Sequence, residues 1–171
     1  KSYLSLKQIP LCKFPRAVFN APTSMILNVF CDGSRDAYGV CAYVTSLSLK
    51  SSHLIYSKSK LAKKATIPMI ELIAIEYATK VTKRLQDIIK PEKTIIWSDS
   101  MLNVHRVHNH PNKYEYRVAR RLINISTVKA EIKHIEGKLN PSDYLTKVHP
   151  IDRLSEPLWL NGPTKLLDST T

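Results

Sequence analysis

The chain has 171 residues, of which 43% are hydrophobic, and this is enough to bury one core and form a single domain. No apolar run reaches the ~18 residues of a membrane-spanning helix, and three cysteines are too few for a disulfide or zinc framework. Twenty-six Lys and Arg against fourteen Asp and Glu give a net charge of +12. This excess favours a polyanionic partner, with nucleic acid as the first choice.

The first 24 residues differ in composition from those that follow. They are rich in proline, which favours an extended arm over a helix or strand. The chain also begins with Lys1 rather than Met, which suggests a piece of a longer polypeptide. We therefore expect an arm or linker over residues 1–24, a folded domain over residues 25–148 and a C-terminal tail over residues 149–171.

Two apolar, β-prone runs, Met25–Phe30 and Val40–Val44, enclose a polar turn. This pattern predicts a β-hairpin whose first strand is buried on both faces. Asp32 directly follows the first run, so we expect its carboxylate at the end of a central strand, although Asp is also ordinary in turns. Alternation over Leu54–Lys60 predicts a third strand, antiparallel to the second.

The period then changes to that of a long amphipathic helix. Thr66 is a candidate N-cap, Pro68 suits a first turn, and the helix should end before Pro91. Its apolar stripe is predicted to consist of Ile70, Ile73, Ala74, Tyr77, Val81 and Leu85. Glu71 should lie in the first turn beside this stripe, either as a partner of the helix dipole or as a carboxylate at the rim of the core.

Residues 93–100, KTIIWSDS, form a short apolar run that ends in Ser-Asp-Ser. A right-handed crossover would make this strand parallel to the first and bring Asp99 to the same sheet edge as Asp32. With Glu71 nearby, several like charges would lie close together, which costs free energy unless cations neutralise them.

The remaining elements are expected to be a short helix, a second helix and a strand, at Met101–Val107, Asn112–Ile125 and Glu131–Ile135. Val118, Leu122 and Ile125 should face inward from the second helix. Asp143 follows the last strand, where a single Asp is usually a helix cap. It would supply a fourth oxygen ligand if its loop folds back to the other acids.

The order of the four acids resembles that of the ribonuclease H family from Met25 to about Val148. The resemblance extends to the ribonuclease H segment of BEL/Pao-type retrotransposon polyproteins, which lies between reverse transcriptase and integrase. It is carried by FCDGSRDAYGVCAYV, SKSKLAKKATIPMIELIA, IIWSDS, HPNKYEYRVARRL, IEGKLNPSDYLTK and LWLNGP. The implied fold is an α/β ribonuclease H-like fold whose five-stranded mixed sheet has three antiparallel strands, then parallel strands, flanked by helices.

The resemblance also implies an activity: endonucleolytic cleavage of the RNA strand of RNA–DNA hybrids during reverse transcription. Two Mg²⁺ ions, which Mn²⁺ can replace, would bind the catalytic carboxylates of Asp32, Glu71, Asp99 and Asp143. Candidate substrate contacts are Gly33, Ser34, Ser100, Lys113, Arg117, Lys138 and Asn140. The implied partner is the upstream reverse transcriptase, and the implied location is a cytoplasmic virus-like particle or reverse-transcription complex.

Two features depart from the cellular members of the fold. Their catalytic loop carries a His in a glycine-rich stretch, whereas here the loop after Ile135 is shorter and Lys138 lies near that position. They also carry a basic insertion between the middle helices, where this chain has only HNHPN. These differences put product release and unaided substrate affinity in question.

Three other functions compete with this one. A transposase or integrase would carry its essential Glu on a late helix, whereas Glu71 belongs to the first. A proofreading exonuclease would have Asp-x-Glu on the first strand, but Gly33 and Ser34 follow Asp32. A non-catalytic module that binds nucleic acid or tethers neighbouring domains remains open, because a sequence does not reveal a misplaced loop.

Overall fold

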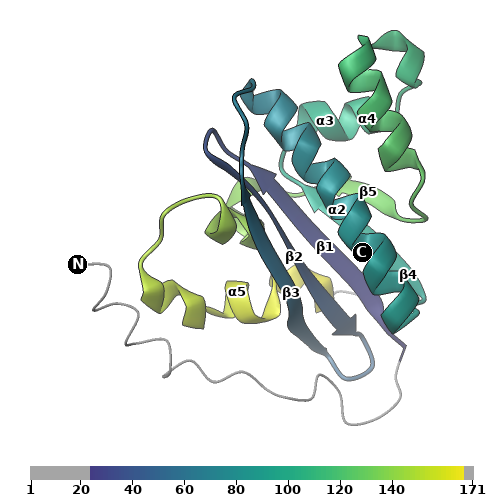
Figure 1. The fold of residues 1–171 in the computed structure, drawn as a ribbon. Helices are drawn as coiled ribbons and strands as arrows, with labels where there is room; N and C mark the ends of the chain where they lie inside the picture. Colours follow the sequence, from purple (N-terminus) through teal and green to yellow (C-terminus); the bar gives the residue numbers. More distant parts are fainter. Residues whose placement is uncertain (1–23, 168–171) are drawn as a thin grey trace.

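The computed structural model describes residues 24–167, so the predicted N-terminal arm lies almost wholly outside the described residues. Five strands form one mixed sheet in the order β3-β2-β1-β4-β5 (Figure 1). The strands are β1 (Ile26–Gly33), β2 (Ala37–Ser46), β3 (Ser51–Leu61), β4 (Lys93–Ser98) and β5 (Glu131–His134). The α-helices are α2 (Ile67–Ile89), α3 (Met101–Val107), α4 (Tyr116–Ser126) and α5 (Pro157–Asn161).

The strand pairing confirms the predicted topology. β1 pairs antiparallel with β2 and parallel with β4, while β2 pairs antiparallel with β3 and β4 parallel with β5. In the β1–β4 ladder, Cys31 lies opposite Ser98. Asp32 follows Cys31 and Asp99 follows Ser98, so both acids lie side by side at the same edge of the sheet.

Side-chain alternation along the strands divides the core between the two faces of the sheet. On one face, Leu27 and Val29 of β1 pack with α2 and α4. On the other face, Phe30 packs with Trp97 and with Trp159 of α5. The helices α2 and α4 therefore cover one face, and the segments after β5 cover the other (Figure 1).

Several predicted boundaries are wrong. β1 continues to Gly33 and β2 begins at Ala37, because the backbone ladder continues past the apolar residues and pairs Asp32 with Gly39. The second helix begins at Tyr116 rather than Asn112, since the 3₁₀ turn η2 (Pro111–Lys113) comes first. No residue in the first turn of α2 is acidic, so Glu71 lies in the second turn.

The apolar stripe of α2 is also broader than predicted. Ile70, Ala74 and Val81 are buried as expected, and the buried face also includes Leu72 and Ile75. The predicted core residues Ile73, Tyr77 and Leu85 are only half-buried. The flank of α2 that carries Ile73 and Tyr77 is therefore open to solvent.

The segment predicted as a tail packs against the sheet. It contains the 3₁₀ helices η5 (Ile151–Ser155) and η6 (Thr164–Leu167) on either side of α5. Trp159 and Leu166 are 5% and 3% exposed and belong to the same core cluster as Tyr43. A domain that ended at residue 148 would lack part of this core. No helix among residues 24–167 is long and apolar enough to cross a membrane.

Candidate active site

Asp32 and Asp99 form the centre of the candidate site, at the carboxyl ends of β1 and β4. Asp32 is buried and Asp99 is half-buried. The loop after β5 passes close to both acids. The hydroxyl of Thr146 donates a hydrogen bond to Asp32 Oδ2, and a Cβ at Gly137 would lie 3.3 Å from Asp99 Oδ2.

Glu71 reaches this edge because α2 lies directly against the end of β1. A Cβ at Gly33 would lie 2.8 Å from the backbone nitrogen of Glu71, so only glycine fits there without moving the backbone. Ser100 Oγ donates to Glu71 Oε2 at 2.6 Å, and Asn103 Nδ2 donates to the same oxygen at 3.2 Å. These bonds connect Glu71 to the segment that follows β4.

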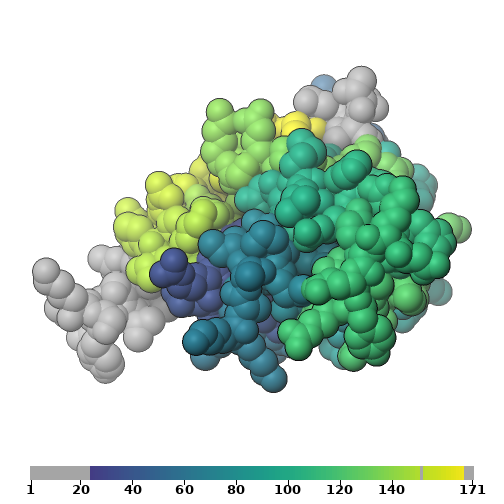
Figure 2. Space-filling view, turned by 90° about the horizontal axis from the view of Figure 1, so that it is seen from above, coloured from purple at the N-terminus to yellow at the C-terminus, as the bar shows by residue number. Residues whose placement is uncertain are grey.

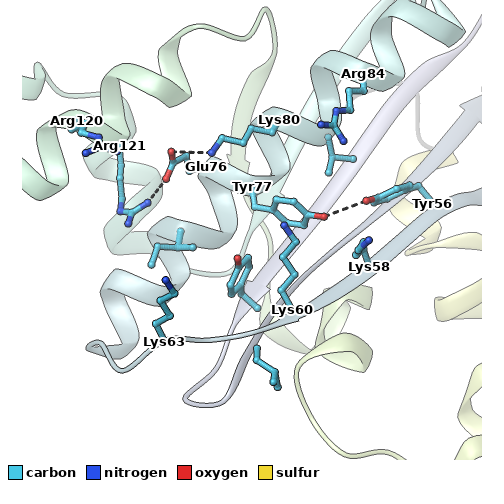
Figure 3. Close-up of a pocket in the computed structure, with 14 residues that line it drawn as sticks. Tyr56, Lys58, Lys60, Lys63, Glu76, Tyr77, Lys80, Arg84, Arg120 and Arg121 are labelled. Atoms are coloured by element: carbon cyan, nitrogen blue, oxygen red, sulfur yellow. Dashed lines mark hydrogen bonds and ion pairs between the residues drawn. The ribbon is translucent and has the colours of Figure 1, made fainter.

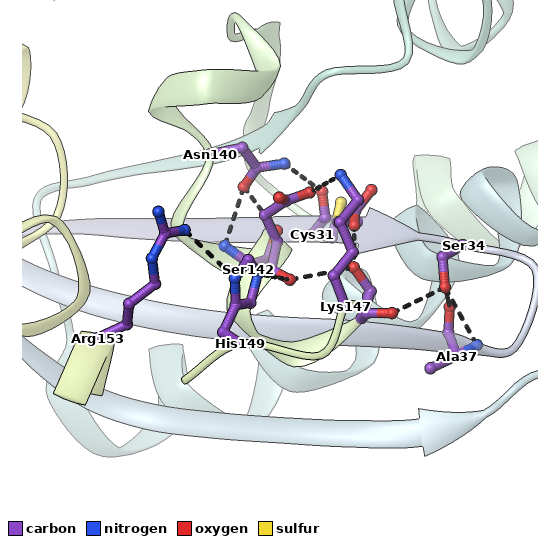
Figure 4. Close-up of polar contacts among 11 residues, drawn as sticks. Cys31, Ser34, Ala37, Asn140, Ser142, Lys147, His149 and Arg153 are labelled. Carbon is purple, nitrogen blue, oxygen red and sulfur yellow. Dashed lines mark hydrogen bonds and ion pairs between the residues drawn. The ribbon is translucent and has the colours of Figure 1, made fainter. Parts of the chain in front are cut away.

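Asp143 lies in the 3₁₀ helix η4 (Pro141–Leu145), and it is not the cap of that helix. Asn140 is the N-cap: its Oδ1 accepts from the Ser142 backbone nitrogen at 3.2 Å. Asn140 Nδ2 also donates to the carbonyl of Cys31 at 3.1 Å, which ties the loop to β1 (Figure 4). The Asp143 carboxylate is thereby free to face Lys147, whose Nζ forms an ion pair with Asp143 Oδ1.

A second bond holds this loop at the hairpin turn. Ser34 Oγ lies 3.0 Å from the carbonyl of Thr146, to which it donates. Figure 4 shows Ser34 on the turn between β1 and β2, with Lys147 close by. In the view from above, the yellow-green residues of this segment lie against the purple hairpin (Figure 2). The loop that carries Asp143 is therefore fixed to β1 and to the hairpin turn.

The electrostatics connect all four acids. Burial is the main cause that raises the pKa of Asp99 to about 6, and the charges of Asp32, Glu71 and Asp143 raise it further. Burial also raises the pKa of Asp32, as does Asp143, while the hydrogen bond from Thr146 opposes the shift. Asp99 is therefore close enough to the other three carboxylates for their charges to raise its pKa.

The side chains are nevertheless not arranged as a metal site. Within residues 24–167, no group of three or more His, Cys, Asp or Glu side chains is positioned to hold a metal ion. Asp32, Glu71 and Asp143 each turn toward a donor of the chain itself. Their oxygen atoms and their mutual repulsion suit a hard divalent cation such as Mg²⁺, so the donor set fits such an ion chemically.

The predicted substrate contacts fall into two groups. Those that border the acids and already hold the site together are Gly33, Ser34, Ser100 and Asn140. Lys138 is exposed and pairs with Glu136 at 3.4 Å. Lys113 and Arg117 are exposed in η2 and α4, and no hydrogen bond or ion pair within residues 24–167 links them to the four acids. A role in substrate binding stays a prediction for both groups.

Sequence reasoning missed Asn103, Thr146 and Lys147, which bond to the acids. Lys147 had a usable signal, because it follows Asp143 by four residues, a spacing at which opposite charges often pair. Asn103 is fully buried, yet its position in a short helix gave no sign of this. Thr146 had no signal in the sequence, because only the path of the loop brings its hydroxyl to Asp32.

Residues 1–100 match the sequence model of a family described as Pao retrotransposon-like RNaseH-like domain. The matched part includes Asp32, Glu71 and Asp99 and ends before Asp143. No curated protein matches the chain significantly.

Several solved structures share the fold. RNase H1 from the halophilic archaeon Halobacterium salinarum is 14% identical with a TM-score of 0.51, over 70% of this chain and 93% of that chain. LC11-RNase H1, isolated from compost and solved with an RNA/DNA hybrid, is 16% identical with a TM-score of 0.54, over 75% and 99%. Prototype foamy virus protease-reverse transcriptase is 15% identical with a TM-score of 0.51, over 94% and 23%. These likenesses confirm the predicted ribonuclease H-like fold.

Proposed function

This chain belongs to the family of Pao retrotransposon-like RNaseH-like domains, and from this premise we propose that it cleaves the RNA strand of RNA–DNA hybrids. The reaction would be an endonucleolytic phosphodiester hydrolysis during reverse transcription of a BEL/Pao-type element. One observation supports the proposal: Asp32 and Asp99 lie side by side at the carboxyl ends of β1 and β4, and Glu71 and Asp143 are near enough for their charges to raise the pKa of Asp99. A fold selected for stability alone gains nothing from such repulsion.

Asp32, Glu71, Asp99 and Asp143 would hold two Mg²⁺ ions, for which Mn²⁺ can substitute. When bound, such ions activate the attacking water and stabilise the leaving 3′-oxygen. The chain itself supplies the positioning. Asp32 and Asp99 are fixed by adjacent strands, Glu71 by the contact of α2 with Gly33, and Asp143 by the anchored loop.

The chain's own donors compete with any cation for these oxygens. Thr146 bonds to Asp32, Ser100 to Glu71 and Lys147 to Asp143. Lys147 is the most exposed of the three donors and sits on a flexible side chain, so Asp143 can exchange partners without a change in the backbone. We infer that Asp143 joins the other acids when cation and hybrid bind together.

The RNA strand would be recognised through its 2′-hydroxyl groups and the shape of the hybrid rather than through a base code. We propose that the upstream reverse transcriptase of the same polyprotein delivers this hybrid. The site of action would be a cytoplasmic virus-like particle or reverse-transcription complex.

A non-catalytic module that binds nucleic acid is the second candidate. It is favoured by the arrangement of the acids, since Asp32, Glu71 and Asp143 already bond to donors of the chain. Such a module would bind a hybrid and leave both strands intact, so a single cleavage assay separates the two functions.

The test uses an RNA–DNA hybrid labelled on the RNA strand, incubated with the purified chain in Mg²⁺ or in EDTA. Single-stranded RNA and a DNA duplex of the same sequence serve as substrate controls. We expect internal cuts in the RNA of the hybrid alone, and only with Mg²⁺. Binding of the hybrid without any cleavage in Mg²⁺ or Mn²⁺ would reject the nuclease and support the non-catalytic module.

A further inference from the structure

A groove with a volume of about 560 Å³ lies between β3 and α2 (Figure 3), and none of the four acids is among its lining residues. We name it the β3–α2 groove. Its walls carry Lys58 and Lys60 from β3 and Lys80 and Arg84 from α2, and Arg121 of α4 reaches one end. Basic segments that are far apart in the sequence therefore converge on one concave surface.

The positive charge of this groove is balanced by almost no acidic side chains. Glu76 is the one acid among its described lining residues, and it is already paired with Arg121 and with Lys80, the latter at 3.4 Å. Figure 3 shows both partners directed at Glu76. Lys58, Lys60 and Arg84 are exposed and form no ion pair among residues 24–167.

Tyrosines shape the floor of the groove. The hydroxyls of Tyr56 and Tyr77 lie 3.3 Å apart, and the rings of Tyr38 and Tyr77 meet edge to face at 5.7 Å. Lys60 Nζ lies 4.1 Å from the centre of the Tyr77 ring, which holds the ammonium group over the groove. At least one cation of the groove, Lys60, is thus held in place by a packed aromatic ring.

We propose that the β3–α2 groove binds the phosphodiester backbone of a nucleic acid, beyond the site of cleavage. Glu71 and Arg84 are separated along α2 by about 20 Å at 1.5 Å per residue, a distance spanned by about six stacked nucleotides. The groove would compensate for the short turn between the middle helices. The proposal rests on the proposed function only for the identity of the nucleic acid.

The test compares two variants of the full chain that each remove two exposed positive charges. Lys58→Gln/Arg84→Gln changes the groove, and Lys90→Gln/Lys129→Gln is the matched control outside it. Binding is measured by fluorescence anisotropy in EDTA, with a hybrid and with the same hybrid carrying a single-stranded extension, at increasing KCl. Because EDTA prevents metal-dependent cleavage, failure of the proposed nuclease would not affect this readout.

We expect the groove variant to bind about tenfold more weakly at low salt, with the slope of log K against log[KCl] reduced by about 2. The control should change by less than about twofold, and both variants should melt like the wild type. A loss with both ligands would identify the duplex as the occupant, and a loss with the extended ligand alone would identify the single strand. An equal loss in groove and control variants, or an unchanged affinity in the groove variant, would overturn the proposal. In the latter case an acidic protein surface would fit the groove better.

Discussion

Asp99 ends β4 in a half-buried position where burial, with the charges of Asp32, Glu71 and Asp143, raises its pKa to about 6. An Asp in the unfolded chain titrates near 3.9. The folded state therefore binds this proton more tightly than the unfolded state does. Stability falls as the pH rises through the window between these two values, and the cost is fully present above it.

Asp99→Asn should therefore stabilise the metal-free protein. We expect a gain on the order of 1 kcal/mol at neutral pH, less than the full pKa shift implies because Asp99 is partly exposed to solvent. The gain should disappear as the pH falls toward 4. Urea unfolding in EDTA across this range measures it, with exposed Asp36→Asn as the control. A loss of stability at neutral pH would mean that the Asp99 carboxylate makes a hydrogen bond whose stabilising effect exceeds the repulsion from the other acids.

Asp143 forms an ion pair with Lys147, so the catalytic role that we propose for it requires an exchange of partners. We expect Asp143→Asn to slow hybrid cleavage by about 100-fold or more in Mg²⁺, because several kcal/mol of transition-state stabilisation depend on correctly held ions. Mn²⁺ should restore part of the rate. A wild-type rate in Mg²⁺ would limit Asp143 to its ion pair with Lys147.

At the residue scale, sequence reasoning found the acids but not their partners. Asp32 and Asp99 were predictable because each follows an apolar run that ends at a sheet edge. Thr146 and Asn140 act on β1 from more than a hundred positions away, through contacts that no local pattern encodes. The sequence left Asp143 open as either a helix cap or a fourth acid ligand. Asn140 is the cap of η4, because its side-chain oxygen accepts from the Ser142 backbone nitrogen, and its amide nitrogen also reaches β1.

At the scale of elements, the contact between α2 and β1 decides where Glu71 lies. A Cβ at Gly33 would meet backbone atoms of Ile70 and Glu71 at 2.8 Å, and backbone cannot rotate away as a side chain can. Gly33→Ala should cost about 1–3 kcal/mol of stability as the helix is pushed outward. It should also slow cleavage, since Glu71 moves with α2. Urea unfolding and hybrid cleavage measure the two effects, and wild-type values for both would show that α2 adapts freely.

The direction of each strand followed from the sequence, but the ends of the elements did not. The helix between β1 and β4 required a crossover, and this fixed their parallel pairing. The ends were placed where apolar residues stop, whereas β1 and β2 continue for as long as their backbone ladder does. Ile73 and Tyr77 are only half-buried because they line the groove between α2 and β3. The helical period alone does not reveal this groove.

At the scale of the whole molecule, the residues after 148 complete the core on the face opposite α2. Trp159 is 5% exposed, and its ring stacks on that of Tyr144 with 5.5 Å between the ring centres. The carbonyl of Trp159 also accepts a hydrogen bond from Tyr43 Oη at 2.7 Å. Trp159→Ala should destabilise the protein by about 3–5 kcal/mol. Tyr116→Ala is the control, because Tyr116 is 77% exposed. Equal midpoints of urea unfolding for the two variants would show that this segment is a dispensable tail.

The rate at which Asp99→Asn cleaves a hybrid shows whether the acids at the ends of β1 and β4 form the active site. Wild type, Asp99→Asn and Asp36→Asn are compared in Mg²⁺ on one labelled hybrid. Asp36 lies in the exposed hairpin turn, so its variant removes a nearby charge without touching the four acids. We predict wild-type cleavage by Asp36→Asn and a loss of about 100-fold or more in Asp99→Asn, with hybrid binding retained. Cleavage by Asp99→Asn at the wild-type rate would mean that the acids at the ends of β1 and β4 are not the active site.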